Sequence, residues 1–143
     1  MKEDTKNLLR ECNAGCKIAV NSLETALLYA KDPEIRAVLE RCRERHETLG
    51  EECGRMLHAE GDSGAEPHPM ARVMSKLGTR MRLSVQNSNA RISSLMADGC
   101  AMGIRSVGKY KNRYAAASPE SRALADSIIS AEEETLRDMV PFF

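Results

Sequence analysis

The chain is 143 residues long, typical of one domain, and 42% of its residues are hydrophobic, enough for a packed core. Its 21 basic and 21 acidic residues balance, so it lacks the basic excess typical of nucleic-acid-binding proteins. No apolar run approaches the roughly 18 residues of a membrane span, and residues 1–4 show no signal-peptide core. We therefore expect a cytoplasmic protein with one domain over residues 1–143 and no nucleic-acid or membrane partner.

Two helices are predicted in the first 60 residues. Apolar residues recur every three or four positions from Leu8 to Ala30, which indicates one stripe of an amphipathic helix. Asp32, Pro33 and Glu34 then supply an N-cap, a first-turn proline and an acid, so the second helix is expected to begin there and to end near residue 61. The apolar stripe of the second helix consists of Ile35, Leu39, Cys42, His46, Leu49, Cys53 and Met56.

The second half of the chain also has a helical period. Residues 58–69 are rich in glycine and proline and predict a loop that is long for a helix connection. A short helix is expected at 70–85 and a long one at 88–114, with a break or a continuation at Asn87. Ser118 and Pro119 predict the start of a last helix, which Pro141 ends. Its apolar positions are Leu124, Ile128, Ala131, Leu136, Met139 and Val140.

These elements predict an all-α fold, because no strand pattern competes with the helical period. We expect an antiparallel four-helix bundle with a long crossover and an extra short helix between helices two and three.

The five cysteines are the main candidates for chemistry. An odd number without a secretion signal argues against a disulfide framework, so reduced thiols are expected. A hairpin turn near Asp32 places Cys16 opposite His46, and Cys12 near Cys53. These four side chains are then expected to lie in one half of the bundle core.

Three interpretations of these residues remain open. Free cysteine is among the most buried residue types, so the thiols are interpreted first as core packing. A Zn²⁺ or copper site is the second interpretation, because i,i+4 pairs share a helix face and thiolate and imidazole suit these ions. The candidate ligands are Cys16, His46, Cys100, Cys12 and Cys53. Thiol catalysis is the third interpretation, and it needs an exposed, activated thiolate.

A standard di-iron centre is not expected. Such centres use an inward Glu from each of two helices and a Glu-x-x-His motif from each of the other two. Here Arg43 stands three residues before His46, and Glu132 is followed three residues later by Thr135. The chain contains no Glu-x-x-His motif.

Several short motifs together resemble a bacterial domain family of unknown function in the ferritin-like superfamily. The motifs lie at residues 12–16 (CNAGC), 32–36 (DPEIR), 69–75 (PMARVMS), 98–104 (DGCAMGI) and 118–120 (SPE). The resemblance implies a ferritin-like bundle with a left-handed crossover, and a homodimer. In related ferritin-like proteins a Gly precedes an inward Glu on helices one and three, whereas here Cys16 and Cys100 follow the glycines.

We therefore expect a ferritin-like bundle without a standard di-iron site, acting as a non-enzymatic structural or interaction protein. This interpretation implies no cofactor, a protein partner that the sequence does not identify, and a filled apolar core without a pocket. The alternative is a soft-metal (Zn or Cu) bundle that uses core Cys and His residues. A further alternative is a degenerate di-iron protein with carboxylates such as Glu24 and Glu132.

Overall fold

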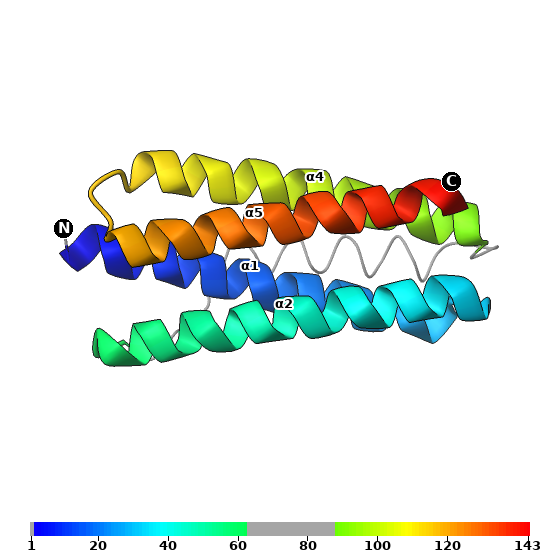
Figure 1. Ribbon diagram of the computed structural model, residues 1–143, viewed down its shortest axis with the longest axis horizontal. Coiled ribbons are helices and arrows are strands. Elements are labelled where there is room, and N and C mark those ends of the chain that lie inside the picture. Colours follow the sequence, from blue (N-terminus) through cyan, green and yellow to red (C-terminus); the bar gives the residue numbers. More distant parts are fainter. Residues whose placement is uncertain (1, 63–87) are drawn as a thin grey trace.

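The computed structural model describes residues 2–62 and 88–143, and within these ranges the chain is helical and contains no strand. Four α helices are present in these ranges, and they lie along one long axis (Figure 1). They are α1 (Lys2–Tyr29), α2 (Pro33–Ala59), α4 (Asn89–Arg113) and α5 (Pro119–Met139), followed by the 3-10 turn η1 (Val140–Phe142). Because α1 contacts α2 and α4, and α5 contacts the same two helices, the four enclose a common core.

The predicted helix starts are confirmed by their caps. The Asp32 carboxylate accepts a hydrogen bond from the amide of Glu34 at 2.8 Å, and Pro33 opens α2. The Ser118 hydroxyl accepts one from the amide of Ser121 at 3.2 Å before α5. Each cap satisfies a backbone donor that has no partner inside the helix. The helix predicted at 88–114 is confirmed as α4, which the Ser88 hydroxyl caps.

Part of the predicted crossover lies outside the described residues. Residues 58 and 59 belong to α2, so the loop predicted to begin at 58 begins later than expected. Gly61 follows with φ at 76°, a conformation that glycine adopts without strain. The rest of the loop at 63–69, the short helix at 70–85 and the possible break at Asn87 are not among the described residues.

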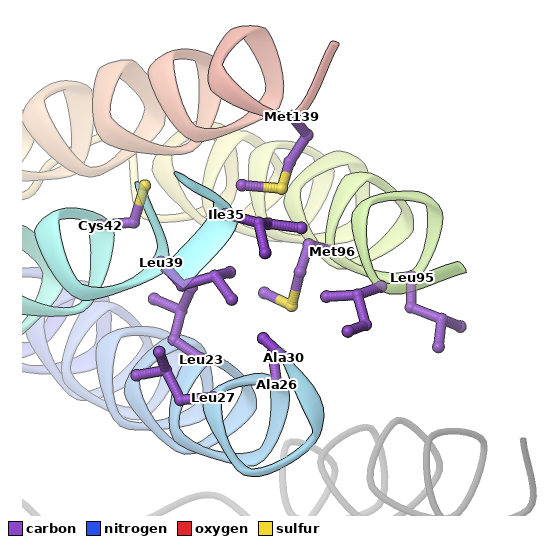
Figure 2. Packing of buried hydrophobic residues seen from close by; sticks show 11 residues of the cluster. Leu23, Ala26, Leu27, Ala30, Ile35, Leu39, Cys42, Leu95, Met96 and Met139 are labelled. Carbon is purple, nitrogen blue, oxygen red and sulfur yellow. The ribbon is translucent and has the colours of Figure 1, made fainter. Parts of the chain in front are cut away.

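The core consists of two apolar clusters, one towards each end of the bundle. Figure 2 shows the first cluster, in which Ile35, Leu39 and Met96 come together between the helices. Leu8, Leu57 and Ile128 belong to the second cluster, at the other end of the same helices. Burying each such side chain contributes roughly 1.5–3 kcal/mol, so these clusters are the main source of stability.

A polar layer separates the two clusters. His46 on α2 and Glu132 on α5 are both buried, with 1% and 7% of their surfaces exposed. Along each helix they lie between residues of the first cluster and residues of the second. None of the helices in the described ranges is both long enough and apolar enough to cross a bilayer.

Candidate functional site

The polar layer is built around a contact between His46 and Glu132. The Nε2 atom of His46 lies 2.6 Å from Oε1 of Glu132, and Nδ1 donates a hydrogen bond to the Cys42 carbonyl at 2.8 Å. A carbonyl and a carboxylate both accept hydrogen bonds, so both ring nitrogens face acceptors. This arrangement favours the doubly protonated imidazolium beside an ionised carboxylate.

The pKa of His46 is raised in this environment. Burial by itself disfavours the charged ring, but the hydrogen bond to Glu132 and the negative charge of this carboxylate outweigh burial. A third contribution comes from the hydrogen bond to the Cys42 carbonyl. The ring is therefore held as the positive member of a buried ion pair over a wider pH range than a free histidine.

Two residues of α4 shape the surroundings of the carboxylate. A Cβ atom built on Gly103 would lie 2.9 Å from Oε2 of Glu132, so any larger residue here would force the carboxylate to shift from its position beside His46. Cys100, one helical turn earlier, hydrogen bonds to Glu132 through its side chain. Burial, and then the charge of Glu132, raise the pKa of this thiol, so it stays protonated at neutral pH.

Two more charge pairs join α2 to α5, and both lie from the buried pair towards the start of α2 and the end of α5. Arg45 pairs with Glu134, and Arg41 pairs with Asp138 at 3.7 Å. Their side chains are partly exposed, so each pair contributes only about 0–1 kcal/mol. These pairs are therefore additional contacts between the two helices and a minor source of stability.

A cavity of about 190 Å³ opens between α1 and α4 and reaches the buried pair. Its walls are mostly apolar and include Ile18, Met96 and Val107. His46 and Glu132 form its polar side, together with the Cys100 thiol. A mostly apolar cavity with a few polar groups at one side is the usual form of a small-molecule site.

The structure divides the predicted metal ligands into two groups. All five cysteines are buried and form no disulfide, and His46 is buried too. The expected burial of these side chains is therefore confirmed. Cys12, Cys16 and Cys53 belong to the second apolar cluster, whereas Cys100 contacts Glu132.

The prediction that Cys16 lies opposite His46 is wrong by about one helical turn. The Cβ of Cys16 lies 3.2 Å from where a Cβ on Gly50 would be, and its side chain hydrogen bonds to Cys53. His46 contacts Glu132 on α5 instead, with Nε2 at 2.6 Å from Oε1.

The thiols are poorly prepared to bind a metal in this conformation. A cysteine must lose its proton before it binds a metal. Burial raises the pKa of the Cys12 thiol. The hydrogen bond to Cys53, together with burial, raises the pKa of the Cys16 thiol, so both thiols hold their protons. Among the residues that the structure describes, no three His, Cys, Asp or Glu side chains are grouped so that they could hold an ion. Glu24, the other carboxylate considered for a di-iron centre, is exposed.

Glu132 is the site residue that the sequence indicates least clearly. The apolar stripe of the last helix was expected to include Leu136 and Val140, but Leu136 is half-buried and Val140 is exposed. Glu132 and Thr135 are buried instead. The available signal was spacing, since Glu132 follows Ile128 by four residues and precedes Thr135 by three.

Comparisons with protein families, with curated proteins and with solved structures find no match to this chain.

Proposed function

We propose that this chain is an antiparallel bundle of the ferritin-like type that binds a small molecule and catalyses no reaction. The observation that carries the proposal is the cavity between α1 and α4, which ends on the buried pair of His46 and Glu132. A purely structural bundle is expected to have a filled core, and this cavity does not fit that expectation.

The buried pair itself supports a binding role. An ion pair in a protein core is often no more stabilising than apolar side chains of the same volume. Stability alone therefore gives little reason to keep His46 and Glu132 in the middle of the bundle. A polar ligand group that enters the cavity provides such a reason, because it needs a partner away from water.

A soft-metal site is the second candidate function. The contact between Cys16 and Cys53 favours it, because two thiols that already hydrogen bond to each other could share a Zn²⁺ or Cu⁺ ion after losing their protons. His46 borders the same surface hollow as Cys16, between α1 and α2. Binding would require the ring to leave Glu132, which costs the buried ion pair.

Elemental analysis separates the two candidates. Protein purified anaerobically without a chelator or an affinity tag is analysed for Zn, Cu and Fe, beside the variant Cys16→Ser/Cys53→Ser. We expect substoichiometric metal in both. Zinc or copper near one per chain, lost in the variant, would establish the metal site instead. Stoichiometric iron would establish the degenerate di-iron alternative.

Binding of a small neutral molecule tests the first candidate directly. Benzyl alcohol is titrated into the protein while amide chemical shifts are recorded. We expect saturable shifts along the cavity walls of α1 and α4, and much weaker binding to Ala19→Leu, whose larger side chain fills the cavity. Val20→Leu, on the adjacent residue outside the cavity lining, is the matched control. No saturable shift in the wild type would contradict the proposal.

The same preparation tests the homodimer that the ferritin-like resemblance implies. Sedimentation equilibrium is expected to give twice the chain mass of 15.8 kDa, and a single-chain mass at all concentrations would contradict a dimer.

A further inference from the structure

A buried hydroxyl on the cavity wall makes no hydrogen bond within the described part of the chain. Ser22 lines the cavity from α1 and is 6% exposed, yet its side chain bonds to none of the described residues. Thr25, one turn later on the same helix, donates to the Asn21 carbonyl at 2.9 Å, as helical hydroxyls often do. A buried polar group without a partner costs free energy. A ligand that hydrogen bonds to Ser22 removes this cost.

The other polar groups of the lining have partners or contact water. His46 donates from both ring nitrogens, one of them to Glu132, and the Cys100 thiol also bonds to Glu132. Ser106, which lines the cavity from α4, is half-buried, so water can reach its hydroxyl. Ser22 is therefore the polar group of the cavity wall that is best placed to bind a ligand.

The charged groups that line the cavity do not favour a charged ligand. His46 and Glu132 neutralise each other, and Asp98 has an interaction partner of its own. No Lys or Arg is among the described residues of the lining. A charged ligand group would leave water without meeting an unmatched opposite charge, which is costly. A hydroxyl group avoids this cost, and it can both donate to Ser22 and accept from it.

The rest of the cavity fits a small apolar body. Ile18 and Leu23 line it from α1, and Met96 and Val107 line it from α4. Its volume of about 190 Å³ compares with an apolar cavity of about 150 Å³ that binds benzene. The ligand is therefore close to one six-membered ring in size.

From these observations we infer that the cavity selects a small uncharged alcohol, whose hydroxyl group hydrogen bonds to Ser22 and whose apolar body packs between α1 and α4. The inference rests on the proposed function, since it names the class of ligand and the polar contact for the same cavity.

One serine variant and two ring compounds of similar size test the inference. Benzyl alcohol has a hydroxyl group and toluene has none, and each is titrated by calorimetry into the wild type and Ser22→Ala. We expect Ser22→Ala to lower the affinity for benzyl alcohol about fivefold, the size of one neutral hydrogen bond, and to leave the affinity for toluene unchanged. Ser94→Ala is the matched control, because Ser94 is exposed and lies outside the lining, and it should change neither affinity.

The stability of the free protein distinguishes a binding role of Ser22 from a structural one. Because its hydroxyl bonds to no described residue, Ser22→Ala is expected to leave the urea midpoint unchanged or to raise it. A clearly lower midpoint would show that the hydroxyl bonds to the protein itself, and it would overturn the inference.

Two charged ring compounds test the preference for an uncharged ligand. Benzylamine is a cation and benzoate an anion at pH 7, and both are close to benzyl alcohol in size. We expect each of them to bind the wild type more weakly than benzyl alcohol. A charged compound that binds more tightly than benzyl alcohol would overturn the inference.

The outcomes separate this inference from the proposed function. If Ser22→Ala changes the affinities for benzyl alcohol and toluene by the same factor, or changes neither, the inference is wrong and the binding cavity stands. If neither compound binds the wild type, the proposed function fails and the inference fails with it.

Discussion

Removing the carboxylate of Glu132 while keeping His46 is expected to destabilise the bundle in a pH-dependent way. In the variant Glu132→Leu, the ring has lost the acceptor that now lies 2.6 Å from its Nε2 atom. Because the ring is 1% exposed and the new leucine has no polar atom, the charged ring has lost its partner inside the core. The folded variant must therefore keep the ring neutral, whereas the unfolded chain protonates it below a pKa of about 6.5.

The magnitude follows from two contributions. A buried donor without its partner costs about 1–3 kcal/mol at any pH. Below pH 6.5, each further pH unit adds about 1.4 kcal/mol to this loss of stability, because the ring takes up a proton only when the variant unfolds. At pH 5.5 the free energy of unfolding is thus about 2–4 kcal/mol lower than in the wild type. Burial of the new leucine offsets part of this loss equally at every pH.

The wild type has the opposite dependence on the same group. Its His46 pKa is raised on folding, so the folded state binds the proton more tightly than the unfolded chain. The stability that this group contributes is fully present below the unfolded pKa of about 6.5 and is lost as the pH rises through the folded pKa. The difference between the wild type and Glu132→Leu therefore grows towards low pH.

Urea unfolding of both proteins between pH 5.5 and 8 measures this difference. The double variant His46→Leu/Glu132→Leu is the control, because replacing a buried pair by apolar side chains is often nearly neutral. We expect the double variant to recover most of the free energy of unfolding that Glu132→Leu loses. Its difference in stability from the wild type is expected to be the same at pH 5.5 and at pH 6. A loss in Glu132→Leu that does not change with pH, or a double variant less stable than the single one, would refute the reasoning.

Two further predictions concern the residues around the pair. Gly103→Ala is expected to lower the free energy of unfolding by about 1–3 kcal/mol, because its Cβ overlaps the Glu132 carboxylate. Gly108→Ala is expected to raise it by about 0.5–1 kcal/mol, because nothing lies within 4 Å of its Cβ. Urea unfolding measures both changes. Equal effects of the two substitutions would contradict the close approach at Gly103. All five thiols are expected to react with Ellman's reagent at pH 8 only at the rate of unfolding, since they are buried. One thiol that reacts at once in the folded protein would contradict this.

The helix boundaries could be predicted from the sequence because local chemistry determines them. Asp32 and Ser118 each precede a proline, and a cap followed by a first-turn proline specifies a helix start without tertiary information. The burial of the cysteines followed from their helical spacing in the same way. Both features depend on residues that are close together in the chain.

The candidate site could not be predicted to the same extent, because it depends on how helices meet. Spacing alone placed Cys16 opposite His46, and a difference of one turn is enough to bring Gly50 and Cys53 there instead. The pairing of His46 with Glu132 joins residues 86 apart, and it needs the space that Gly103 leaves on a third helix. No periodicity within one helix carries that information.

The central claim is that a small molecule can enter the bundle beside the buried pair, and diffraction from crystals pressurised with xenon tests it most directly. Xenon binds apolar cavities of this size without needing a specific chemical group. The account predicts a xenon peak between α1 and α4, in contact with Ile18, Met96 and Val107. Side chains that fill this space, with no xenon peak, would contradict it.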